Sequence, residues 1–203
     1  MTAPGTNKHR GKIVDLVHRR IYPGYIEVKN GRITTVREDH SVSERTFLCP
    51  GFVDAHVHIE SSMLTPPEFA RIAVAHGTVA TVSDPHEIAN VLGIGGVRYM
   101  QKSAASTPCK IHFGIPSCVP ATKFETAGAT MGPDAVEELC ADPSLLYLSE
   151  MMNFPGVIHG DPEVMKKIEI AEKHGKRIDG HAPGLRGADL QTYVAAGIET
   201  DHE

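Results

Sequence analysis

The run Pro50-Gly51-Phe52-Val53-Asp54-Ala55-His56-Val57-His58 decides the fold, because it is an apolar, strand-like segment that ends in two histidines one residue apart. Residues i and i+2 of a β-strand project from the same face, so both imidazoles would point to one side and could bind one metal ion. A His-x-His pair also occurs on solvated loops, so the pair alone leaves metal binding and a surface role equally open. The rest of the chain has to distinguish them.

The composition is that of an ordinary globular protein. The 203 residues are 41% hydrophobic and 22% charged, which suits one large domain or two small ones. A formal net charge of -5 argues against a nucleic-acid partner. The polar first ten residues and the lack of an apolar run of membrane length favour a cytoplasmic protein with no membrane partner. The four cysteines form no C-x-x-C pair, so we expect reduced and mostly buried thiols.

The sequence pattern changes near residue 50. Before it, short β-prone runs lie at 12–17, 24–29 and 31–36, and the hairpin signal Asn30-Gly31 joins the last two. We assign residues 1–49 to the N-terminal part of a small β-sandwich domain. After residue 50, we expect strands at 51–57, 78–83, 110–115, 145–149, 177–180 and 197–200. Amphipathic helices are expected between them, at 67–75, 96–104, 133–140, 162–174 and 188–196.

Strands that alternate with helices predict a parallel α/β sheet with the helices outside. We favour a (β/α)8 TIM-type barrel and assign residues 50–203 to about six of its βα units. A doubly wound open sheet is the alternative. Its Gly-rich phosphate turn after the first strand is absent, since His56-Val57-His58 stands there instead.

The functional groups of a barrel lie at the carboxyl ends of its strands. Four of the expected strands end in histidine and three in a carboxylate: His56 and His58, Asp84 to Glu87, Glu150, His181, and Asp201 to Glu203. A helix cap or a structural role explains Asp84 or His86 singly as well as function does. Taken together, the set favours a shared metal site. Nitrogen and carboxylate ligands suit Zn, Mn or Fe, and a carboxylate can bridge two ions.

Five ordered motifs carry a family resemblance. The run from Pro50 to Met63 resembles the amidohydrolase superfamily, and its extension Glu60-Ser61-Ser62 resembles the adenine deaminases within it. Four later segments are similar to the same family in the same order, at 84–91, 116–121, 150–157 and 180–184. The resemblance covers nearly the whole chain.

The resemblance implies a binuclear divalent metal centre, with Mn(II) as the first choice and Fe(II) or Zn(II) as suitable substitutes. His56 and His58 would hold one ion, His181 and His202 the other, and Glu150 would bridge them and act in catalysis. A hydroxide between the ions would attack C6 of adenine and release hypoxanthine and ammonia, a reaction of purine salvage.

Further roles are expected next to these ligands. We expect His86 and Glu87 to be catalytic, and Glu60, Ser61 and Asp84 to contact the substrate. An additional metal at Asp84 to Glu87, a helix cap at Asp84, a structural His86, and a helix cap within Glu60 to Ser62 remain open alternatives.

Six strand units are visible in the sequence, whereas a closed barrel needs eight, and the proton-shuttling aspartate of the family has no counterpart here. We therefore expect the N-terminal portion of an adenine deaminase, with a C-terminal half missing and little or no turnover alone. The full-length form is expected to be a homo-oligomer that binds the small molecule adenine. The alternatives are another amidohydrolase activity, such as a cyclic amidase or an amino-sugar deacetylase, and a non-catalytic metal-binding remnant.

Overall fold

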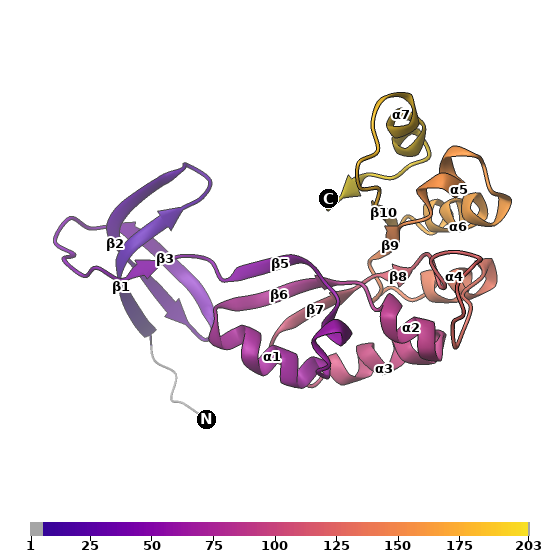
Figure 1. Cartoon of the computed structure of the whole chain (residues 1–203). Helices are drawn as coiled ribbons and strands as arrows, with labels where there is room; N and C mark the ends of the chain where they lie inside the picture. Colours follow the sequence, from indigo (N-terminus) through magenta and orange to yellow (C-terminus); the bar gives the residue numbers. More distant parts are fainter. Residues whose placement is uncertain (1–5, 203) are drawn as a thin grey trace. The chain divides into compact units, whose positions relative to one another are not determined.

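A computed structural model describes residues 6–202 (Figure 1). The chain divides into two compact units, one up to Gly51 and one from Phe52 onward, and each is described by itself. Among the described residues, no helix is both long and apolar enough to span a membrane.

The first unit is a four-stranded sheet with the order β3-β2-β1-β4. β1 (Thr6–Asp15) and β2 (Arg20–Lys29) are antiparallel, β3 (Arg32–Glu38) pairs with β2, and the short β4 (Phe47–Leu48) runs parallel to β1. The predicted hairpin at Asn30-Gly31 is confirmed, and both residues have the positive φ that such a turn requires, 52° and 73°.

The first expected strand, at 12–17, was misplaced. β1 begins at residue 6 and ends at Asp15, and the chain turns over the four residues before Arg20. The polar residues at 7–10 show no apolar alternation, yet their main chain pairs with β2 in continuous register. Main-chain pairing therefore extends a strand where the side-chain pattern gives no signal.

The second unit contains a series of parallel strands in chain order. β5 (Phe52–Val57), β6 (Thr78–Ser83) and β7 (Lys110–Phe113) form one sheet. The other contains β8 (Ile115–Pro116), β9 (Tyr147–Met151), β10 (Arg177–Gly180) and β11 (Thr200–Asp201).

β7 and β8 are two parts of one extended run that changes partner at Gly114. Its N–H donates to the carbonyl of Ser83 on the β6 side, 2.9 Å away. On the β9 side, a Cβ at Gly114 would lie 2.7 Å from side-chain atoms of Tyr147 and Ser149. This close approach requires a glycine. The change of partner at Gly114 connects the two sheets into one series of six strands.

Helices connect the successive strands. α1 (Pro66–Ala75) follows β5 and the 3-10 turn η1 (Ile59–Ser62), and α2 (His86–Leu92) and α3 (Ile94–Ala104) follow β6. α4 (Pro133–Cys140) precedes β9, α5 (Phe154–Ile158) and α6 (Pro162–Lys173) precede β10, and α7 (Gly187–Ala195) precedes β11. In Figure 1, α1, α2 and α3 lie along one side of β5, β6 and β7.

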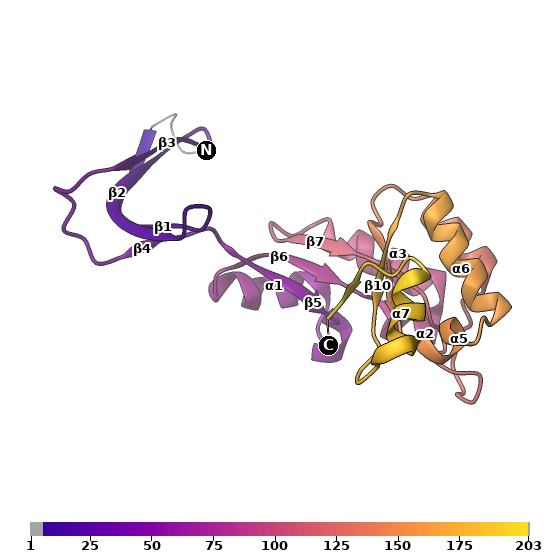
Figure 2. The same cartoon turned by 90° about the horizontal axis from the view of Figure 1, so that it is seen from above.

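Strand order that follows chain order distinguishes a barrel-type fold from a doubly wound sheet, in which the order reverses at a switch point. The described chain carries six strands of the barrel type, the first five of them followed by helices, which agrees with the predicted fold class. The core lies between strands and helices, where side chains such as Val97, Leu139, Leu148, Ile168 and Ile178 are almost completely buried. Figure 2 shows α6 beside β10. Each fully buried aliphatic side chain contributes about 1.5 to 3 kcal/mol.

The predicted elements are close to the observed ones, with two exceptions that affect the site. The fourth barrel strand lies at Tyr147–Met151 and not at 145–149, so Glu150 is inside the strand and does not follow it. The sixth is Thr200–Asp201 and not 197–200. α2 and α5 were not predicted, because they have only seven and five residues and show no full amphipathic period.

Candidate metal centre

The carboxyl ends of four barrel strands bring the five expected ligands together. His56 lies in β5 and His58 follows it, Glu150 lies in β9, His181 follows β10 and His202 follows β11. All five side chains take part in contacts around one carboxylate, that of Glu150, which is 3% exposed.

The first histidine pair contacts one oxygen of Glu150. Nε2 of His56 and Nε2 of His58 lie 2.7 Å and 2.8 Å from Oε1, and 3.0 Å from each other. His58 donates its Nδ1–H to the carbonyl of Asp84, 2.9 Å away, which leaves Nε2 as the nitrogen that can bind a metal.

The second pair lies toward the other oxygen. Nδ1 of His181 is 3.8 Å from Oε2 of Glu150 and 3.1 Å from Nε2 of His202. The ring of His202 also stacks on that of His56, with 3.7 Å between centroids and 8° between planes. The first and sixth strands of the series therefore deliver side chains to the same place, as the curvature of a barrel requires.

Burial and ion pairing perturb the pKa values of this cluster in opposite directions. Burial opposes the charged form of both partners, but the close pairing of His58 with Glu150 raises the pKa of the imidazole and lowers that of the carboxyl. The other histidines near Glu150 lower its pKa further. Burial lowers the pKa of His56, so this imidazole is held neutral, which is the form that binds metal.

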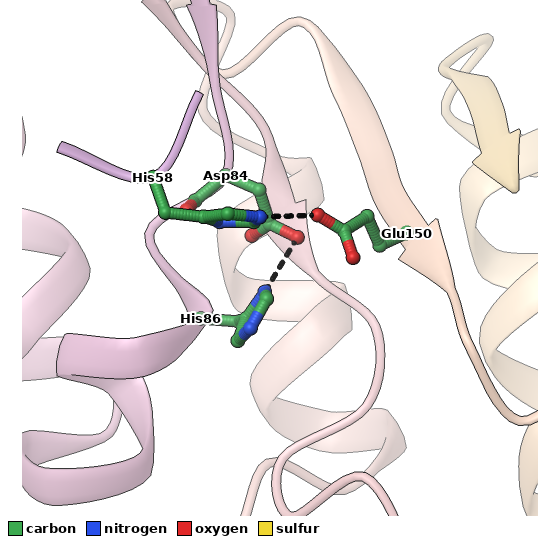
Figure 3. Close-up of side chains that lie close together, drawn as sticks. All are labelled: His58, Asp84, His86 and Glu150. Carbon is green, nitrogen blue, oxygen red and sulfur yellow. Dashed lines mark hydrogen bonds and ion pairs between the residues drawn. The ribbon is translucent and has the colours of Figure 1, made fainter. Parts of the chain in front are cut away.

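Asp84 and His86 form a pair beside His58 (Figure 3). Nδ1 of His86 donates to Oδ2 of Asp84, 3.0 Å away, and the His86 ring meets the His58 ring edge-on at 4.5 Å. Burial lowers the pKa of His86, but the bond to Asp84 raises it overall. The alternative that Asp84 caps the following helix is wrong, because α2 has Pro85 at its N-cap and no side-chain capping bond.

The remaining expected residues lie in a layer around η1. Ser61 donates its hydroxyl to Oε1 of Glu87, 2.7 Å away, and both side chains are exposed. Glu60 accepts the N–H of Ile88 at 3.2 Å, and burial raises its pKa. Glu60, Ser61 and Ser62 lie in η1 and do not cap the following helix α1, whose N-cap is Thr65. Glu60 instead accepts a main-chain N–H from the first turn of α2.

Asp179 is a residue that sequence reasoning missed. Its Oδ2 lies 3.4 Å from Nδ1 of His202, and Oδ1 accepts the hydroxyl of Thr200 at 2.6 Å. His56, Asp179 and His202 also form one of three groups, within residues 6–202, whose possible ligand atoms lie within 4.8 Å of one another. The available signal was strand alternation, which places Asp179 on the same face as His181.

The donor set fits divalent metal ions. Oε1 of Glu150 and Oδ1 of Asp84 are buried, and neither accepts a hydrogen bond of adequate geometry among the described residues. Ligand bonds of about 2.1 Å place neighbouring donors about 3 Å apart, close to the spacing between Oε1 and the two imidazoles. Imidazole nitrogens with a shared carboxylate suit Zn, Mn and Fe ions.

Residues 47–203 match the model of a family described as the amidohydrolase family. The chain belongs to the amidohydrolase family. This family is metal-dependent, and the side chains around Glu150 form a possible cluster of metal ligands.

Curated relatives of this amidohydrolase extend well beyond the matched region. The chain is 59% identical over 194 residues to an adenine deaminase of Sulfurovum sp., which covers 96% of this chain and 36% of the relative. It is 60% identical over 196 residues to an adenine deaminase of Methanosarcina mazei, covering 97% of this chain and 35% of the relative. The chain therefore spans about a third of the length of these relatives.

Solved structures of similar fold are distant in sequence. An N-acetyl-D-glucosamine-6-phosphate deacetylase from Mycobacterium smegmatis has a TM-score of 0.61 and 15% identity, covering 97% of this chain and 55% of that one. An L-hydantoinase from Arthrobacter aurescens has a TM-score of 0.53 and 17% identity, covering 92% and 45%. At such identities the likeness supports the fold alone.

Proposed function

We propose that the protein deaminates adenine, using water to give hypoxanthine and ammonia, at a centre of two divalent metal ions. The observation that carries this proposal is the placement of Glu150 between two histidine pairs. Its support from sequence is the identity of 59% to 60% to proteins named adenine deaminase.

The proposed ligands divide by the two oxygens of Glu150. His56 and His58 face Oε1 and would hold one ion, while His181 and His202 lie toward Oε2 and would hold the other. Metal ions bound there would supply a Lewis acid and activate water near neutral pH. The residues themselves hold the imidazoles neutral or paired and exclude bulk water from the buried carboxylate.

His86 is proposed to move a proton at Nε2. Its Nδ1–H is engaged by Oδ2 of Asp84, so the opposite nitrogen is the one available for exchange. Glu87 is the second proposed catalytic group, since its carboxylate is exposed and held by Ser61 at the same rim.

Substrate contacts are assigned to Glu60, Ser61 and Asp84. Oε2 of Glu60 and Oδ1 of Asp84 are buried acceptors without a hydrogen bond among the described residues. Adenine offers N–H donors that match such acceptors, and leaving these groups unpaired costs about 1 to 3 kcal/mol each. A purine with an exocyclic amine therefore suits the site chemically.

The finer assignments follow from the same proposal. Mn(II) is our choice of native ion, with Fe(II) and Zn(II) able to occupy the same donors. We place the protein in the cytoplasm, in purine salvage, as a homo-oligomer.

The test uses the protein purified from the cells that naturally produce it and then loaded with Mn(II). We expect adenine to be converted to equal amounts of hypoxanthine and ammonia, measured by chromatography and an ammonia assay. His56→Asn should abolish the reaction, while His76→Asn, on the exposed end of α1, should not. Hydrolysis of a cyclic amide or of an N-acetylated amino sugar without action on adenine would overturn the proposal in favour of another amidohydrolase activity.

A further inference from the structure

Glu150 has an unusual main-chain conformation. Its φ is 24°, whereas the other described non-glycine residues with positive φ, Arg19, Asn30 and Met63, lie in turns or at the end of η1. Glu150 lies inside β9 and is buried. Such a conformation costs about 1 to 3 kcal/mol and persists only when surrounding contacts hold it.

One side-chain hydrogen bond holds the Glu150 carbonyl from the neighbouring strand. The hydroxyl of Ser117, which follows β8, donates to the Glu150 carbonyl at 2.6 Å. Ser117 is 1% exposed, so this bond is shielded from water. The N–H of Met152 donates to the same carbonyl at 2.7 Å and completes its hydrogen bonding.

Ser117 is itself held by a buried lysine. Nζ of Lys167, on α6, donates to the Ser117 carbonyl at 3.0 Å and lies 3.3 Å from Oε1 of Glu163. The Lys167 side chain is 8% exposed, so an outer helix is connected to the segment after β8. The contacts run from Lys167 through Ser117 to Glu150 and then to His56 and His58.

From these contacts we infer that Ser117 is a positioning residue for the metal-bridging carboxylate. It fixes the direction of the Glu150 carbonyl and so keeps φ positive, which directs Oε1 toward the histidines. Without the hydroxyl, the main chain of Glu150 relaxes and its carboxylate turns away from them. The inference rests on the proposed binuclear centre and adds a residue that binds neither metal nor substrate.

The chain offers a matched control. Ser149, on β9, donates its hydroxyl to the carbonyl of Ile115 on β8 at 3.0 Å and is fully buried. Ser149→Ala therefore removes a hydroxyl-to-carbonyl bond between the same two segments, one residue away. Ser149→Ala leaves the carbonyl of Glu150 untouched. Any change in this variant therefore measures the effect of losing one buried hydrogen bond without an effect on Glu150.

The experiment compares Mn(II) binding by calorimetry and the visible absorption of the Co(II)-loaded protein in the parent, Ser117→Ala and Ser149→Ala. We expect Ser117→Ala to weaken Mn(II) affinity by about 10- to 100-fold and to shift the Co(II) bands. Ser149→Ala should keep the parent spectrum and an affinity within about threefold, the scatter expected for a residue outside the ligand network. Equal changes in both variants, or none in Ser117→Ala, would overturn the inference.

Two further outcomes are distinguishable. If Ser117→Ala fails to fold by circular dichroism, Ser117→Cys keeps the size and a weaker donor, and its affinity should fall between those of the parent and a full loss. Parent-like binding in that variant would contradict the inference. A parent protein that binds no Mn(II) would instead refute the proposed metal centre itself.

Discussion

The carboxylate of Glu150 lies with one oxygen toward His56 and His58 and the other toward His181. Glu150→Gln keeps the shape but removes the charge that a bridging ligand needs. We expect Mn(II) affinity to fall by about 10- to 100-fold, measured by calorimetry, and turnover of adenine to be lost. Glu169→Gln, on the exposed face of α6, is the control. Unchanged affinity in Glu150→Gln would contradict the bridging role.

Tyr193, on α7, connects two of the ligand-bearing segments. Its hydroxyl donates to the carbonyl of Met151 at 2.7 Å and accepts the N–H of His181 at 3.1 Å. Tyr193→Phe removes both hydrogen bonds to the main chain, so we expect the free energy of unfolding to fall by about 1 to 3 kcal/mol. Urea denaturation measures it. Tyr99→Phe, at a side chain that is 48% exposed, should change little, and equal effects would refute this role.

Individual elements were predictable where local chemistry and period agree. α6 begins at Pro162 after Asp161, whose carboxylate accepts the N–H groups of Glu163 and Val164, and it then shows a full amphipathic pattern. Most strands of the second unit were located by apolar runs between turn signals, although the bounds of β9 and β11 were shifted. α5 escaped prediction because five residues around Pro155 carry too little periodicity.

The segment between α4 and β9 is fixed to α3 through Asp142. Its carboxylate accepts hydrogen bonds from the main chain and hydroxyl of Ser144, and from Gln101 and Arg98. Burial opposes ionisation, but these bonds hold the pKa of Asp142 well below its usual value. A depressed folded-state pKa stabilises the protein above the unfolded value, about 3.9, and this contribution disappears as the pH falls through the folded value.

The lowered pKa of Asp142 in the folded state predicts how the contact between Asp142 and α3 depends on pH. The stability difference between the parent and Asp142→Asn should be largest near pH 7 and shrink as the pH falls to about 3. Thermal unfolding followed by circular dichroism across this range measures it. Two curves that remain parallel down to the acid end would show that Asp142 does not stabilise this contact through its charge.

The candidate metal centre is built from residues between 56 and 202. Only the parallel winding of the second unit brings them together. The sequence predicted that winding and the convergence of these side chains, because strand ends in a barrel face one rim. Their role as metal ligands came from the family resemblance and stays a prediction. It did not predict the positive φ of Glu150, since glutamate has no preference for that region. The bond from Ser117 to Glu150 spans 33 residues and depends on β8 and β9 being neighbours, so no local pattern could reveal it.

The most direct test of the proposed binuclear centre is the metal content of the purified protein after Mn(II) loading and dialysis, measured by plasma mass spectrometry. We predict about two ions per chain, about one in His58→Asn and about one in His181→Asn, because each variant removes a ligand of a different ion. His76→Asn, on the exposed end of α1, should retain both. A parent that holds no Mn(II), or histidine variants that hold as much as the His76→Asn control, would contradict the binuclear centre.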